Sequence, residues 1–291
     1  MTTSIQDAPK THTSRKMAAF GRKEFIKVEK NVKLHVTNLG EGKAVVLIHG
    51  SPLSNAMYEY QYQELVEKGF QVIGITMRGF GKSDKPYGKY TYDVFADDIK
   101  VVLETLDIKD ATLGGFSMGG AIATHYVVRH HTAHVAKLAL FGAASPKWTS
   151  GVDYPYGFTA EEVNGMIEQS KTNRAALYQS FGSIFTASPT SLPAGLDVWL
   201  CNINWEASPY AATQCLVALR DEDLRSEMGQ IHIPVAIFHG VHDKIVPLAI
   251  GEQALQLLKN AYLVRFENSG HGLFVEEREK FNRELLAFLQ K

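Results

Sequence analysis

The sequence predicts an α/β protein with a mostly parallel central sheet that is flanked by helices. Short apolar runs of strand length alternate with longer stretches of helical period along most of the chain. The apolar runs are continuous, which is typical of strands covered on both faces. Strands that alternate with helices form βαβ units, and these units give a parallel sheet with helices on both faces.

Eight strands are expected. The first two, KEFIKVE (23–29) and VKLHVTN (32–38), predict an antiparallel pair. The six strands of the parallel part are predicted at AVVLIHG (44–50), QVIGIT (71–76), ATLGGF (111–116), AKLALFG (136–142), PVAIFHG (234–240) and AYLVRFE (261–267).

Amphipathic helices are predicted between most of the strands and at the end of the chain. Between 91 and 107, six apolar residues fall on one helical face: Tyr92, Phe95, Ile99, Val102, Leu103 and Leu106. The last segment repeats this pattern with Phe274, Phe281, Leu285 and Phe288, and so predicts a C-terminal helix that packs on the sheet.

The alternation breaks in residues 145–230. This segment has helical patterns and turn clusters such as TASPTSLPAG, but no run of sheet quality. We expect it to be a helical cap insertion over one end of the sheet, within a single domain whose core is 23–144 and 231–291. Residues 1–22 are polar and rich in Thr, Ser and Lys, and predict either a disordered extension or an arm that packs on a neighbouring subunit.

Composition narrows the range of functions. The chain has 291 residues, of which 45% are hydrophobic and 21% charged, as in globular proteins with a large core. Because 30 Lys and Arg balance 31 Asp and Glu, we expect neither nucleic acid nor a membrane as a partner. Cys201 and Cys215 predict buried thiols, with no disulfide and no metal site. Without a membrane-length apolar run or a signal-peptide core, the expected location is cytoplasmic.

The segment GGFSMGG (114–120) places one serine between glycines. Ser117 lies between a predicted strand and a helix that begins at about Met118, so the chain turns sharply there. Side chains at 115 and 119 would collide with the adjoining strand and helix, and Gly115 and Gly119 remove them. This G-x-S-x-G elbow is typical of α/β-hydrolases and predicts that Ser117 is a nucleophile above the carboxyl end of the sheet.

A serine hydroxyl needs a base, and a base needs an orienting acid. His271, in the loop FENSGHGLF after the last predicted strand, is the expected base. Asp243, in the loop after PVAIFHG, is the expected acid, and Glu267 is a weaker candidate because it lies on a predicted strand. The plainer alternatives are a solvated loop histidine and a turn aspartate.

Ester chemistry also needs two N–H groups for the developing oxyanion. The Met118 N–H lies at a helix N-terminus and is one expected donor. The second is the Ser51 N–H in the loop LIHGSPLSNAMY, since Pro52 has no N–H. His49 is expected to organise this loop.

Longer segments carry a more specific resemblance. VVLIHGSPLS, RGFGKSDKP, YTYDVFADDIKVVLETLDIKDATLGGFSMGG, HGVHDKIVP and the insertion segment WLCNINWEASPYAATQCLVALRDEDLRSEM resemble the cofactor-free haloperoxidases, or perhydrolases, of the α/β-hydrolase superfamily over residues 25–290. The resemblance implies a serine esterase without metal or other cofactor, whose acyl-enzyme is released by water or by hydrogen peroxide. Many members of the family are oligomers, so the resemblance is compatible with a homo-oligomer in which residues 1–22 form an arm.

The resemblance assigns the same site residues. The nucleophile, acid and base of the family correspond to Ser117, Asp243 and His271, and its oxyanion donors to Ser51 and Met118. The loop proline that the family links to peracid chemistry corresponds to Pro52. Relatives usually carry a bulky aromatic residue where this chain has Ser51, so we expect a wider or more polar acyl pocket.

Substrate choice is expected to depend on the cap, and the expected ligand is a small-molecule ester. Trp199 and Trp205, together with Pro52, are candidates for the pocket lining, although core packing explains each tryptophan equally well. The same triad serves C–C bond hydrolases, thioesterases, acyltransferases and aminopeptidases, so these remain alternatives. A non-catalytic ligand receptor built on the same fold is a further alternative.

Overall fold

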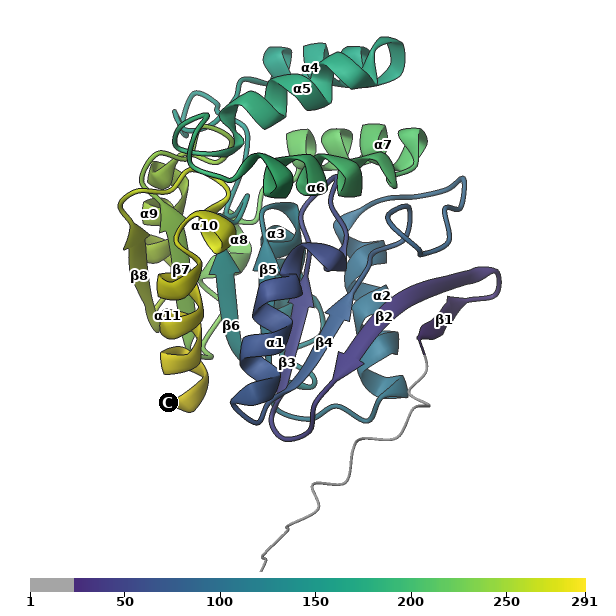
Figure 1. Cartoon of the computed structure of the whole chain (residues 1–291), viewed down its shortest axis with the longest axis vertical. Coiled ribbons are helices and arrows are strands. Elements are labelled where there is room, and N and C mark those ends of the chain that lie inside the picture. Colours follow the sequence, from purple (N-terminus) through teal and green to yellow (C-terminus); the bar gives the residue numbers. More distant parts are fainter. Residues whose placement is uncertain (1–23) are drawn as a thin grey trace, which may run out of the picture.

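The computed structural model describes residues 24–291, and the predicted N-terminal extension lies outside them (Figure 1). Its centre is a sheet of eight strands in the order β1-β2-β4-β3-β5-β6-β7-β8. The strands are β1 (Phe25–Glu29), β2 (Val32–Leu39), β3 (Ala44–Ile48), β4 (Gln71–Ile75), β5 (Ala111–Phe116), β6 (Val135–Phe141), β7 (Val235–Gly240) and β8 (Ala261–Phe266).

The pairing of the strands confirms the predicted α/β-hydrolase fold. β1 pairs antiparallel with β2, and β2 pairs antiparallel with β4. From β4 to β8 every pair is parallel. The central strands β3, β5 and β7 are buried along their whole length, which explains why their sequences are continuous apolar runs.

Helices cover both faces of the sheet. One hydrophobic cluster joins the sheet to α1 and α11, and a second joins its other face to α2, α3 and α9 (Figure 1). The helices are α1 (Glu59–Glu67), α2 (Tyr92–Thr105), α3 (Met118–Arg129), α9 (Leu248–Leu257) and α11 (Arg278–Gln290), with a short 3₁₀ helix η1 (Asn55–Tyr58) before α1.

The C-terminal helical segment is split in two. The predicted apolar face runs over both α10 (Leu273–Glu276) and α11, and Phe274 belongs to the shorter helix. Glu277 leaves helical geometry between them, with φ −114° and ψ 51°. Its carboxylate accepts hydrogen bonds from the Ser269 hydroxyl (2.7 Å) and the Asn268 N–H (3.0 Å), so the break ties the helix to the loop that precedes it.

The segment between β6 and β7 is helical and lies over the carboxyl ends of the parallel strands (Figure 1). Within the described part of this segment, extended pairing is limited to isolated bridges such as Lys147↔Asp223. Thr159 caps α4 in a capping box with Glu162. The helices are α4 (Ala160–Thr172), α5 (Arg174–Phe185), α6 (Ala194–Trp205), α7 (Pro209–Asp221) and α8 (Arg225–Met228).

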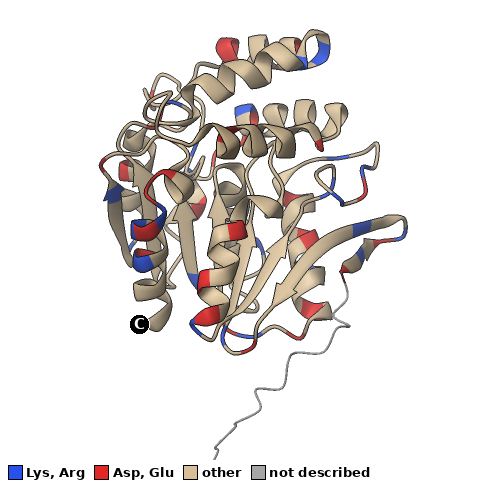
Figure 2. Cartoon of the chain, viewed as in Figure 1, with Lys and Arg blue, Asp and Glu red and all other residues tan. Residues whose placement is uncertain are grey.

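Charged residues are distributed over the whole fold. Figure 2 shows the positions of basic and acidic residues interspersed along the core helices, the cap and the edge strands. Among residues 24–291, no helix has both the length and the apolar character that crossing a bilayer requires.

Candidate active site

Ser117 occupies a sharp turn between β5 and α3. Its backbone angles are φ 53° and ψ −121°, in a region that non-glycine residues rarely adopt. Hydrogen bonds on both sides hold this conformation. The Ser117 N–H donates to the Phe141 carbonyl (2.9 Å), and the Ser117 carbonyl accepts from the N–H groups of Gly120 and Ala144 (3.0 Å each).

The flanking glycines are required by close backbone approach. A side chain at Gly115 would collide with the Gly119 carbonyl, and a side chain at Gly119 would collide with the carbonyls of Ile48 and His49. A side chain at Gly50 would come within 2.9 Å of the Ser117 Cβ. The turn therefore packs so closely against the end of β3 that side chains at these glycine positions would not fit.

His271 and Asp243 are joined across the end of the sheet. His271 Nδ1 lies 2.7 Å from Asp243 Oδ2, and both residues are buried. The other carboxylate oxygen accepts from the N–H groups of Ile245 (2.9 Å) and Val246 (2.8 Å), which fixes the plane of the carboxylate. A carboxylate can only accept, so Nδ1 carries a proton, and in the neutral tautomer with this hydrogen bond the lone pair is on Nε2.

Two nearby titratable side chains, His239 and Glu267, have other partners and do not take part in the hydrogen bond between Asp243 and His271. His239 lies 3.7 Å from Asp243 but donates its Nε2–H to the Val246 carbonyl (2.7 Å). Burial lowers the pKa of His239, so it stays neutral beside the carboxylate. Glu267, the weaker candidate for the acid, instead pairs with Arg265 on the surface at 3.6 Å.

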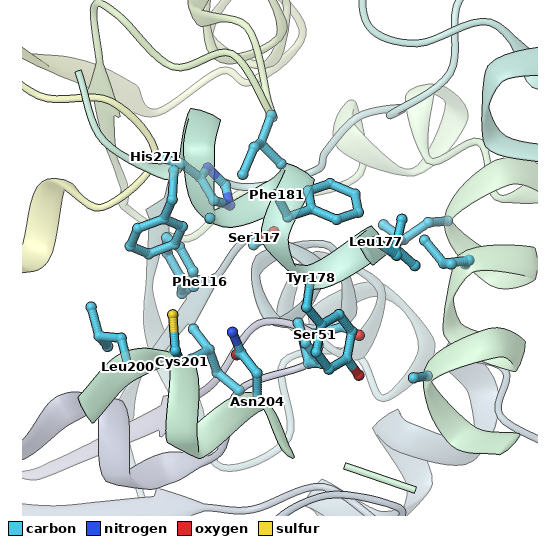
Figure 3. A pocket seen from close by; sticks show the side chains of 18 of the residues that line it. Ser51, Phe116, Ser117, Leu177, Tyr178, Phe181, Leu200, Cys201, Asn204 and His271 are labelled. Carbon is cyan, nitrogen blue, oxygen red and sulfur yellow. The ribbon is translucent and has the colours of Figure 1, made fainter. Parts of the chain in front are cut away.

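The imidazole of His271 lies between aromatic rings on the wall of a pocket. The ring centre of Phe116 is 4.6 Å away and that of Phe185 is 5.8 Å away. Ser117 and His271 line the same pocket (Figure 3). Within the described residues no hydrogen bond joins the Ser117 hydroxyl to the imidazole, although both side chains line the pocket.

The loop after β3 brings Ser51 to the same pocket. His49 is fully buried and organises this loop: its Nε2 accepts from the Met77 N–H (3.0 Å), so its Nδ1–H donates to the Gly50 carbonyl (2.8 Å). Burial lowers the pKa of His49 to about 4, which keeps it neutral. Met118 is the first residue of α3, and its N–H therefore has no acceptor within the helix.

The pocket lies between the sheet and the cap and has a volume of about 90 Å³. Ser51 and Pro52 belong to its lining. Its other walls come largely from α5, α6 and α7 and are mostly apolar. They include Leu177, Phe181, Phe185, Leu200, Leu216, Leu219 and Ile245.

The tryptophan of the pocket is Trp148, not the two that the sequence suggested. Trp148 lines the cavity, and its indole N–H donates to the Ile245 carbonyl (2.8 Å). Trp199 packs against Tyr60, and Trp205 is 46% exposed and packs against Tyr178 (5.1 Å between ring centres). Both residues lie on α6, but their side chains point to faces of the helix that miss the cavity.

Glu276 joins the His271 loop to the cap, and the sequence analysis did not identify it. One carboxylate oxygen accepts from the Gly270 N–H and the other from the Ala187 N–H, each at 2.8 Å. The Gly272 N–H also donates to the Phe185 carbonyl (2.9 Å). Burial raises the pKa of Glu276. The only local signal is a glutamate five residues after the histidine, because its cap partner is 89 residues away in sequence.

No three His, Cys, Asp or Glu side chains within residues 24–291 come close enough together to hold a metal ion. Of the two thiols, Cys215 is fully buried and Cys201 lines the pocket. Burial raises the pKa of both thiols, so neither resembles an activated thiolate.

Comparison with known proteins places the chain among hydrolases. A family model described as the alpha/beta hydrolase fold matches residues 43–278. The chain is 43% identical to the AB hydrolase superfamily protein YisY of Bacillus subtilis, over 91% of this chain and 98% of that protein. It is 31% identical to the non-heme chloroperoxidase CPO-A1 of Kitasatospora aureofaciens, over 89% and 97% of the two chains. The solved structure of an esterase (EaEST) from Exiguobacterium antarcticum is 40% identical and superposes with a TM-score of 0.90, covering 93% of this chain and 100% of the esterase.

Proposed function

The chain belongs to the α/β-hydrolase family, in the branch of the non-heme haloperoxidases, and is a hydrolase; from this premise we propose that it cleaves carboxylic esters through an acyl-enzyme on Ser117. One observation carries the proposal. The imidazole of His271, oriented by a 2.7 Å hydrogen bond to Asp243, lines the same pocket as the serine of the strained turn. A ligand-binding site alone needs neither a base nor an acid that orients it.

The proposed reaction follows from the protonation states. The free Nε2 of His271 takes the proton of the Ser117 hydroxyl as the oxygen attacks the ester carbonyl. The backbone N–H groups of Ser51 and Met118 stabilise the oxyanion, and Asp243 stabilises the imidazolium. The imidazolium then gives its proton to the leaving alcohol. A water molecule, deprotonated by His271, attacks the acyl-enzyme; the carboxylic acid is released as the imidazolium returns its proton to the Ser117 oxygen.

A turnover assay tests this proposal. We expect hydrolysis of short p-nitrophenyl esters, a burst of p-nitrophenol if deacylation is slow, and labelling by a fluorophosphonate probe. Ser117→Ala should abolish both turnover and labelling. Full activity in Ser117→Ala would contradict the mechanism. Cleavage of a thioester, an amide or a C–C bond in preference to esters would point to another reaction of the same triad.

Perhydrolysis is the second candidate, and the presence of Pro52 in the pocket lining favours it. In this reaction hydrogen peroxide replaces water as the nucleophile at the acyl-enzyme, so the products are a peracid and free Ser117. The peracid, not the protein, would oxidise bromide. The test is bromination of monochlorodimedone in acetate with peroxide, compared between the wild type and Pro52→Leu. An equal rate in the absence of acetate would contradict this route.

A further inference from the structure

One face of α6 supplies a polar stripe to the pocket. Asp197, Cys201 and Asn204 are spaced by four and three residues, so they share one side of the helix, and all three line the cavity together with Leu200 (Figure 3). The rest of the cap lining is mostly apolar. Neither the triad nor the oxyanion donors account for polar side chains at these positions.

The side-chain oxygen of Asn204 has no hydrogen-bond partner among residues 24–291. This Oδ1 atom is also buried. Buried polar atoms are almost always paired, by protein, water or ligand. An acceptor that lines a cavity and has no protein partner is therefore suited to a donor on a bound molecule.

Tyr178 and Ser51 add hydroxyl groups to the lining of the same cavity. In the view of Figure 3, both side chains lie on the same side of Ser117 as Asn204, and His271 lies on the opposite side. Burial raises the pKa of the Tyr178 hydroxyl, which keeps its proton available for donation. Together, the three side chains offer both donors and acceptors.

The charge of the lining excludes one class of substrate. Over the described residues that line the pocket, neither Lys nor Arg occurs, and Asp197 is the carboxylate at its exposed rim. Arg174 lies outside the lining, where it stacks on Tyr178 (5.3 Å) and Trp205 and donates to the Ala207 carbonyl. A carboxylate on the substrate would lose its hydration and gain no counter-charge.

We propose that the Ser51, Tyr178 and Asn204 side chains form a subsite for an uncharged hydrogen-bonding group, such as a hydroxyl, on the ester substrate, with Asn204 determining specificity. This inference rests on the proposed esterase function and names its substrate class. Esters that carry a hydroxyl at this subsite are preferred over those with a methyl group, and esters with a free carboxylate are disfavoured. A site that hydrogen-bonds a substrate hydroxyl discriminates strongly against analogues that lack it, because its buried polar groups are then left unpaired.

Isosteric ester pairs test the proposal. On the acyl side, ethyl 3-hydroxybutanoate is compared with ethyl 3-methylbutanoate; on the alcohol side, 2-hydroxyethyl acetate is compared with propyl acetate. The acid released is followed by pH-stat titration. We expect a ratio of kcat/KM of at least about tenfold in favour of the hydroxylated member of one pair. Asn204→Leu should bring that ratio to about one or below.

Asn202→Leu is the matched control, because Asn202 lies on the same helix but is exposed and outside the pocket lining. It should leave the ratio unchanged. Circular dichroism shows whether each variant folds; if Asn204→Leu does not, Ser51→Ala removes a single hydroxyl and should also lower the ratio. Wild-type ratios near one in both pairs, or a ratio that survives Asn204→Leu, would overturn this inference while esterase activity stands. Failure of the wild type to hydrolyse any ester would overturn the proposed function itself.

Discussion

The elbow and the cap face each other across the same pocket, but they are built in opposite ways. At the elbow, a side chain at Gly119 would collide with backbone carbonyls of the neighbouring strand. In the cap, a side chain at Gly165 would meet nothing within 4 Å. Backbone contacts fix the elbow, whereas side chains of the cap helices form the opposite wall of the pocket. The chemistry is therefore expected to depend on the first region and substrate choice on the second.

The largest expected effect is at the elbow. Ser117→Ala should lower kcat for p-nitrophenyl esters by about 10⁴-fold or more, because no other group in the pocket replaces the attacking oxygen. The matched change in the cap is Ser180→Ala on an exposed position of α5, which should leave kcat unchanged. The measurement is steady-state kinetics on both variants at the same pH. Similar losses in both would mean that the two regions are not distinct in function.

His271→Gln should cause a loss of comparable size. Glutamine cannot take the serine proton, and Asp243 would then have no imidazolium to stabilise. Single-turnover kinetics should show that acylation itself slows, since the base is needed in the first step. If only release of the acyl group slowed, His271 would act on water alone and another base would have to serve Ser117.

The two regions also differ in how far the sequence predicts them. The strands and the elbow have local signals: continuous apolar runs, and glycines around one serine. The loops of Asp243 and His271 follow recognisable strands, so topology alone brings them to one end of the sheet. The residues of the pocket wall have no such local signal. Trp199 and Trp205 face away from the cavity because of how α6 packs against its neighbours. Likewise, the contact from Glu276 to Ala187 depends on how the cap packs against the core.

A pair of identical substitutions tests the structural side of the comparison. Gly119→Ala should destabilise the protein by about 2–3 kcal/mol, because an added methyl group overpacks a backbone contact. Gly165→Ala should stabilise it by about 0.5–1 kcal/mol, since alanine is the better helix former at an exposed position of α4. Urea unfolding measures both. Equal effects of the same sign would contradict the view that the elbow is packed more tightly than this face of α4.

The contact between the two regions should have an intermediate effect. Glu276→Gln keeps one acceptor oxygen but places an NH₂ group opposite the second N–H, so either Gly270 or Ala187 loses its partner. Because Gly270 precedes His271, we expect kcat to fall about tenfold while KM changes less. Glu279→Gln, on an exposed position of α11, is the control. A change in KM alone would show that Glu276 acts on the cap and not on the base.

The smallest effect is expected at the exposed rim of the pocket, where water screens the charge of Asp197. Monoethyl succinate and ethyl succinamate have the same shape but differ in a carboxylate, so the ratio of their kcat/KM values isolates the charge. Asp197→Asn should raise the kcat/KM for monoethyl succinate relative to that for ethyl succinamate by about two- to fivefold. The reason is that an exposed charge at short range contributes about 1 kcal/mol or less. Glu161→Gln, exposed on α4 and outside the pocket lining, should not change this ratio. Since the Debye length falls to about 3 Å at 1 M salt, high salt should shrink the effect of Asp197→Asn towards zero. An effect that persists at high salt would mean that Asp197 contacts the substrate directly. The cap would then act, like the elbow, through short-range contacts and not through long-range electrostatics.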